Sequence, residues 1–111
     1  HLNFVANFYD KNLIKLKGIT LLNKKNDRNS TNWLYTILVP KRKRFFNIMK
    51  KKNIPVSLVH RGIDRNKIFG GIDKKLINQR YFDNNHICLP IHERLSEKDL
   101  KKIVSVIKEN F

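Results

Sequence analysis

The segment from Ser96 to Phe111 constrains the fold most, because it combines a helix start signal with a complete apolar stripe. The order Ser-Glu-Lys-Asp at its start is a capping box, in which Ser96 and Asp99 each accept from the other's backbone amide. An amphipathic helix of this kind must bury its stripe against a second layer. The apolar residues at helical spacing are Leu100, Ile103, Val104 and Ile107.

Helical and extended patterns alternate along the rest of the chain. They predict an α+β fold: a single domain over residues 1–111, with helices on one face of a small three- or four-stranded sheet. The predicted helices are Leu2–Lys17, which Gly18 ends, Lys41–Lys52, and Lys74–Asn84. The predicted extended segments are Ile19–Leu22, Trp33–Val39, Pro55–His60 and His86–Pro90, and Asn23–Asn32 is predicted as a solvated loop.

The stretch Asn53–Gly71 carries the candidate functional residues. Its first half is apolar and β-branched, which predicts the strand that delivers His60, and its second half is a polar loop bounded by glycines. Histidine and arginine side chains suit a ligand that offers hydroxyls or phosphate. The candidate site residues are His60, Arg61, Asp64 and Arg65.

Each candidate also has a structural interpretation. His60 serves equally well as a histidine at the edge of the core, the arginines as surface side chains, and Asp64 as a turn cap. A triad of Ser57, His60 and Asp64 is set aside, because residues three apart on a strand point to opposite faces. His60, His86 and His92 lack the spacing of a metal site.

The net charge of +15 makes nucleic acid, or another anionic partner, the alternative function for a basic α+β module. The basic residues are spread along a chain rich in Asn and Ile, which is typical of an AT-rich coding sequence and favours a solvated lysine surface. The densest clusters are Lys41–Arg44 and Lys50–Lys52. Steep salt dependence of oligonucleotide binding would distinguish this alternative.

The single cysteine, Cys88, excludes an internal disulfide and suits a reducing compartment. It is expected to be a small buried hydrophobe in a strand. No apolar run approaches the roughly 20 residues that span a bilayer, and the start has no signal-peptide pattern. The chain begins with His1 instead of Met, so we expect it to be a piece of a longer protein.

Several segments together match one known pattern. A strand precedes the basic-aromatic helix start Arg44-Phe45, and a Leu-Pro followed by Leu-Ser-Glu-x-Asp leads into the last helix. The other matching segments are Asn53–His60, Asp64, Ile68-Phe69, His86–His92 and Ile103-Val104. With them, nearly the whole chain resembles the C-terminal end of the DegT/StrS sugar aminotransferases, and Leu2–Leu22 is similar to the helix that leaves their large domain.

The resemblance implies the small domain of the aspartate aminotransferase fold, in a cytoplasmic, homodimeric pyridoxal-phosphate enzyme of polysaccharide biosynthesis. Such enzymes move an amino group, usually from glutamate, onto a nucleotide-linked keto-sugar. It also implies that the cofactor lysine lies in a large N-terminal domain outside these residues, so this chain alone binds no cofactor. His60 is the best match to the sugar side of the site. Asp64 follows the pattern of one subgroup with Ile63 in place of Asn, and Arg61 and Arg65 are candidates by charge.

Overall fold

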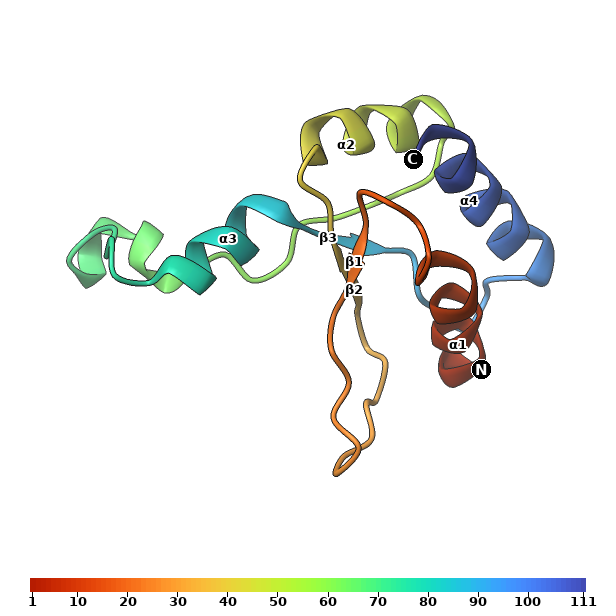
Figure 1. The fold of residues 1–111 in the computed structure, drawn as a ribbon, viewed down its shortest axis with the longest axis horizontal. Coiled ribbons are helices and arrows are strands. Elements are labelled where there is room, and N and C mark those ends of the chain that lie inside the picture. The colour runs from red at the N-terminus through yellow and green to blue at the C-terminus, as the bar shows by residue number, and fades with distance from the viewer.

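The computed structural model describes residues 1–111. Four α-helices and three strands follow one another with two short 3-10 helices, η1 (Ile63–Arg65) and η2 (Lys67–Phe69). The α-helices are α1 (Leu2–Leu13), α2 (Arg42–Lys51), α3 (Ile77–Asn85) and α4 (Glu97–Asn110). The strands are β1 (Thr20–Leu21), β2 (Tyr35–Leu38) and β3 (His86–Leu89) (Figure 1). The predicted elements are present apart from the strand over Pro55–His60, but α1 ends at Leu13 and not at Lys17 before Gly18 as predicted.

The three strands form one antiparallel sheet in the order β1-β2-β3. In the central strand, Ile37 lies opposite Leu21 on one side and opposite Ile87 on the other. The predicted α+β class with a small sheet is confirmed, and the sheet has three strands. None of the helices combines the length and apolarity needed to cross a membrane.

One hydrophobic core joins α1, α2 and α4 to β2 and β3. Phe45 and Met49 of α2 are fully buried. Leu100 and Ile107 of the predicted apolar stripe of α4 are fully buried as well. The hydroxyl of Tyr9 on α1 donates to the carbonyl of Pro90 at 2.8 Å. This hydrogen bond satisfies a buried hydroxyl that would otherwise have no partner in the core.

The predicted strand over Pro55–His60 is wrong. Only Ser57 pairs with the sheet, through two backbone hydrogen bonds with Cys88 of 2.9 and 3.2 Å. Pro55 has no amide hydrogen to donate, and His60 adopts a left-handed conformation (φ 63°), so the residues on both sides of the bridge cannot extend the ladder. The segment is tied to the sheet at one point and then leaves it.

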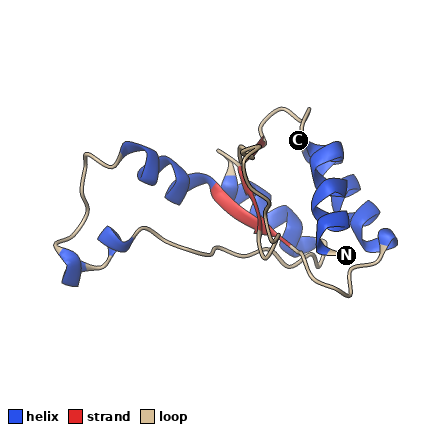
Figure 2. Ribbon diagram, turned by 90° about the horizontal axis from the view of Figure 1, so that it is seen from below, coloured by secondary structure: helices blue, strands red, loops and turns tan.

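The chain carries two projections. One is the hairpin between β1 and β2, and the other comprises residues 61–85, with η1, η2 and α3, and is called the arm below. Figures 1 and 2 show the arm extending away from the helices and the sheet. The radius of gyration is 15.0 Å, against about 13 Å for a compact domain of this length. The arm is therefore supported by interactions of its own.

The capping box gives the first test. Replacing Ser96 by Ala removes the acceptor for the Asp99 amide (3.1 Å) and should cost about 1 kcal/mol. We expect hydrogen exchange of the first-turn amides of α4 to become roughly fivefold faster. Ser105→Ala is the control, since the Ser105 hydroxyl bonds only to the Glu109 side chain in mid-helix. Equal exchange in both variants would contradict the assigned cap.

Candidate functional site

His60 stands where the chain leaves the sheet and enters the arm. It is exposed, and its φ of 63° is unusual for a residue with a side chain. Its imidazole lies against the indole of Trp33, with ring centroids 5.7 Å apart and an angle of 65° between the ring planes. Strained backbone of this kind gathers at functional sites, where surrounding structure holds it in place.

The arm is organised around the carboxylate of Asp83, on α3. This side chain is completely buried, yet no hydrophobic core surrounds it, because no arm residue belongs to the core. It accepts hydrogen bonds from the Gly62 amide (3.0 Å), from Arg65 Nε (3.0 Å) and from Gln79 Nε2 (2.8 Å). The carboxylate thereby ties the start of the arm to its final helix.

Asp64 makes a second polar junction in the arm. Its side chain pairs with Arg80 at 2.9 Å and accepts from the Asp73 amide at 3.0 Å. Asp64 is predicted as a ligand-facing residue or as a turn cap. Its contact with the Asp73 amide spans nine residues and joins two parts of the arm. Asp64 and Arg65 both turn toward arm residues, whereas His60 and Arg61 remain exposed at the arm's base.

Both carboxyl groups are held in the charged form. The Asp73 amide and then the Arg80 guanidinium lower the pKa of Asp64 below its usual range. For Asp83, burial alone raises the pKa, but the bonds from Arg65, Gln79 and the Gly62 amide outweigh it, and the pKa is lowered. The ionised state is thus the state that stabilises the arm.

Three arginines gather around the base of the arm. Arg42 of α2 donates to the backbone carbonyls of Asp83 and His86. Burial lowers the pKa of Arg42, and the positive charges of Arg65 and Arg61 lower it further. The carboxylate of Asp83 offsets part of this repulsion. The Arg61 guanidinium itself suits an anionic group such as phosphate.

Gly62 is required by space rather than by backbone conformation. A Cβ atom at this position would lie 2.6 Å from Asp83 Oδ2 and 2.8 Å from Asp64 Oδ1. The residue therefore lets the chain pass between the two carboxylates while its amide bonds to one of them.

Sequence reasoning missed Asp83, Arg80, Gln79 and Gly62. The signal available was the spacing Gln-x-x-x-Asp within a predicted helix, which places Gln79 and Asp83 on one helix face. Nothing local identifies the partners of Asp83 in the loop, since they lie 18 and 21 residues away along the chain. Trp33 was recognised only as a strand former, although it lies before the first residue of β2.

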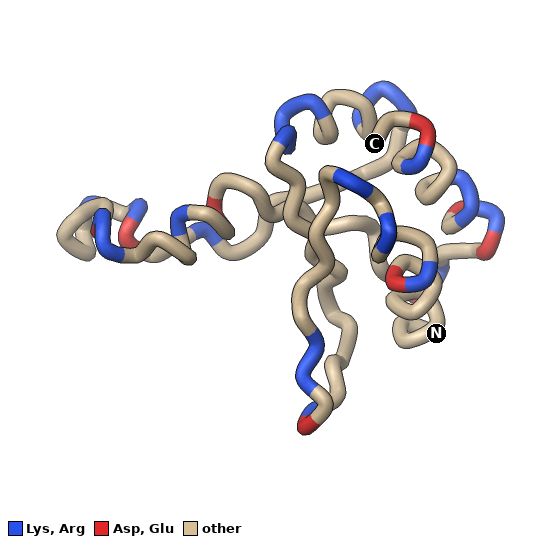
Figure 3. Tube along the Cα trace, in the orientation of Figure 1, with Lys and Arg blue, Asp and Glu red and all other residues tan.

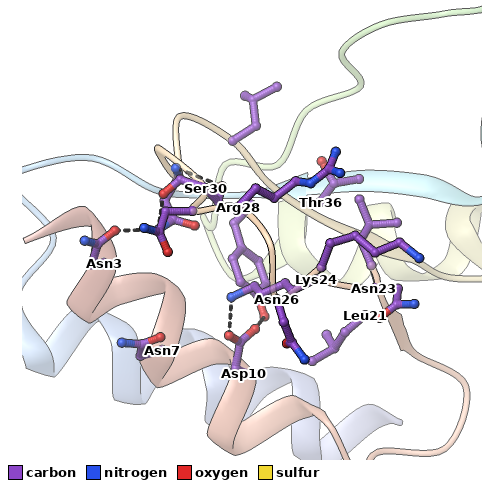
Figure 4. Close-up of a pocket in the computed structure, with 16 residues that line it drawn as sticks. Asn3, Asn7, Asp10, Leu21, Asn23, Lys24, Asn26, Arg28, Ser30 and Thr36 are labelled. Atoms are coloured by element: carbon purple, nitrogen blue, oxygen red, sulfur yellow. Dashed lines mark hydrogen bonds and ion pairs between the residues drawn. The ribbon is translucent and has the colours of Figure 1, made fainter.

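A larger hollow than any at the arm's base lies elsewhere, between α1 and the hairpin. It has a volume of about 860 Å³ and is lined mainly by asparagines and basic residues. Figure 4 shows Asp10 paired with Lys24 among the lining residues. The hydroxyl of Tyr35 donates to the same carboxylate at 2.7 Å. None of the four predicted site residues lines it.

Charge is not concentrated on one surface. Figure 3 shows Lys and Arg on the hairpin, the arm and each α-helix. Within the cluster Lys41–Arg44, Arg42 is bonded to the base of the arm. No group of His, Cys, Asp and Glu side chains is arranged to hold a metal ion.

A covalently held cofactor such as pyridoxal phosphate needs an enclosed lysine, and the lysines of this chain do not fit that need. Every lysine is exposed. Lys24, which lines the hollow beside the hairpin, is paired with Asp10.

The sequence matches the model of the DegT/DnrJ/EryC1/StrS aminotransferase family over residues 2–108. The chain belongs to this family. The resemblance inferred from the sequence motifs is thereby confirmed. No curated protein sequence matches the chain.

Solved structures with this fold include several aminotransferases. The sugar aminotransferase CalS13 from Micromonospora echinospora superposes with a TM-score of 0.92 at 24% identity, covering 99% of this chain and 30% of its own. AtS13 from Actinomadura melliaura gives 0.91 at 26% identity with the same coverage. DesV from S. venezuelae, solved with a ketimine intermediate, gives 0.89 at 16% identity, covering 97% of this chain and 30% of its own. The chain thus spans about 30% of the length of these structures.

Acid should loosen the arm. Because the pKa values of Asp64 and Asp83 are lowered on folding, their stabilising contribution is present above the unfolded-state value, about pH 4, and is lost as the pH falls through the folded values. We expect the hydrogen-exchange protection of arm amides, corrected for intrinsic rates, to hold down to about pH 4 and then to fall.

Asp83→Asn should reproduce this loosening at neutral pH. It removes the charge that pairs with Arg65, and we expect exchange at the Gly62 amide to rise on the order of tenfold. Asp27→Asn is the matched control, since the exposed Asp27 pairs only with its neighbour Arg28. If both variants exchange like the wild type, Asp83 does not hold the arm.

Proposed function

We propose that this chain is the small domain of a pyridoxal-phosphate-dependent aminotransferase that transfers an amino group from glutamate to a nucleotide-linked keto-sugar. The family match over residues 2–108 carries the proposal. The fold shared with sugar aminotransferases that are more than three times as long supports it. The cofactor and its lysine belong to a large domain outside these residues, and the enzyme is a cytoplasmic homodimer that supplies amino sugars for polysaccharide biosynthesis.

The arm supports the presence of that larger partner. Its large apolar side chains are exposed, and Ile68 is 85% exposed. Exposed apolar side chains gathered on one projecting element are typical of an interaction surface. We assign this surface to the large domain of the same protein. The residues concerned are Ile63, Ile68, Phe69, Ile72, Leu76, Ile77 and Tyr81.

His60 and Arg61 then contribute to the substrate side of the active site. The exposed imidazole offers a hydrogen bond to a sugar hydroxyl. The Arg61 guanidinium, at the positive base of the arm, suits a diphosphate oxygen. Asp64 and Arg65 act on the substrate indirectly, because their contacts fix the loop that carries these two side chains.

Replacing His60 by Ala in the full-length enzyme tests this role. We expect the KM for the nucleotide sugar to rise roughly tenfold, as for one lost hydrogen bond to substrate, while cofactor affinity stays within about twofold. Steady-state kinetics and cofactor titration provide the two measurements. Asn66→Ala, at an exposed position in the same loop, is the control. Unchanged kinetics for the sugar would make His60 a structural residue.

Replacing the arm isoleucines tests the assigned interface. In the full-length protein, Ile68→Ser and Ile77→Ser should each lower the free energy of unfolding by about 2 kcal/mol, because each side chain is buried there. Ile14→Ser, at a comparably exposed position after α1, should have little effect. Thermal unfolding provides the comparison. Full stability in both arm variants would mean that the arm remains exposed in the complete protein.

A further inference from the structure

We propose that Trp33 is a substrate-binding residue whose indole stacks on the sugar ring of the nucleotide sugar. This inference rests on the proposed function and adds a contact that the sequence motifs do not supply. The indole side chain would stack on the apolar face of a hexose, while the neighbouring imidazole of His60 would form hydrogen bonds with the hydroxyls of the sugar.

The first observation is the exposure of Trp33. It is the only tryptophan of the chain, it is 66% exposed, and it is absent from the hydrophobic core. Burial of an aromatic side chain this large is a substantial source of stability. A tryptophan left exposed on a domain that buries Tyr9, Tyr35 and Phe45 is open to contact by a group from outside the domain.

The second observation is that the backbone holds Trp33 and His60 together through two left-handed residues. His60 is itself one of them, and Asn32, directly before Trp33, is the other (φ 52°). Two hydrogen bonds anchor Asn32. Its backbone amide donates to Ser30 Oγ (3.1 Å), and its side-chain Nδ2 donates to Asn3 Oδ1 (2.6 Å). The edge-on contact of the two rings is thus fixed from both sides.

The third observation is a small pocket beside the indole. It has a volume of about 270 Å³ and is lined by Trp33 together with Val56, Leu89 and Pro90, among other residues. Ligand sites run from roughly 300 Å³ upward, so this pocket has room for one ring and not for a complete nucleotide. The bridge between Ser57 and Cys88 passes along this pocket and holds its walls in register.

A sugar ring fits this arrangement better than an isolated phosphate. The pocket wall is mainly apolar, which matches the C–H face of a pyranose, and polar groups stand at its edge. Arg61 follows His60 directly in the sequence, and its exposed guanidinium would suit the diphosphate that follows the sugar. In this arrangement the sugar would contact Trp33 and His60, the diphosphate would contact Arg61, and the nucleoside would lie beyond Arg61.

Calorimetric titration of the full-length enzyme tests the proposal. The probes are UDP-glucose and dTDP-glucose, each compared with its nucleoside diphosphate. Trp33→Leu keeps an apolar side chain but removes the ring, and should weaken sugar-nucleotide binding roughly tenfold while the diphosphate binds within about twofold of wild type. Trp33→Phe should retain most of the affinity. Phe4→Ala, at an exposed aromatic on α1, should change neither.

The outcomes separate the two proposals. Equal affinity of wild type and Trp33→Leu for the sugar nucleotide would overturn the role of Trp33 and leave the proposed function intact. An equal loss for the diphosphate would also overturn it, because the ring would then hold the base. A wild-type enzyme that binds diphosphates but discriminates against both sugar nucleotides, and aminates no keto-sugar nucleotide, would overturn the proposed function itself. Thermal unfolding of each variant verifies that the fold is intact.

Discussion

The buried carboxylate of Asp83 is the interaction on which the projecting half of the molecule depends. It lies outside the hydrophobic core and is still completely inaccessible, because Gly62, Arg65 and Gln79 surround it. A buried charge is costly unless every bond it can make is made. Here two side chains and a backbone amide compensate the charge of the carboxylate. Because leaving this charge without its donors is unfavourable, the loop must stay where Gly62 and Arg65 reach the carboxylate.

The molecule thus holds together in two different ways. The helices α1, α2 and α4 pack with the sheet around apolar side chains, which resist changes of pH and salt. The arm relies on ion pairs and hydrogen bonds and leaves its apolar side chains outward. The proposed substrate-facing residues, His60 and Arg61, lie at the junction between the sheet and the arm. Their positions therefore depend on both the sheet and the arm.

Elements defined by local signals were predictable from the sequence. The capping box at Ser96 and the apolar stripe of α4 need only neighbours three or four residues away, and both agree with the structure. The strand at Pro55–His60 failed because pairing depends on a partner strand, and only Ser57 finds one. The contacts of Asp83 with Gly62 and Arg65 could not be foreseen, since these partners lie 21 and 18 residues away in the sequence. The chance that an exposed Trp33 would meet His60 was equally invisible, because 27 positions separate them.

Gly62 has a consequence for how this sequence can diverge. Its φ of −53° is ordinary for any amino acid, so the restriction to glycine comes entirely from the two carboxylates that a side chain would strike. A larger residue there becomes acceptable only when both Asp83 and Asp64 give way to shorter side chains or move. Positions 62, 64 and 83 should therefore change together during evolution. A protein with only one of these substitutions would have a poorly anchored loop until a compensating substitution removed the clash.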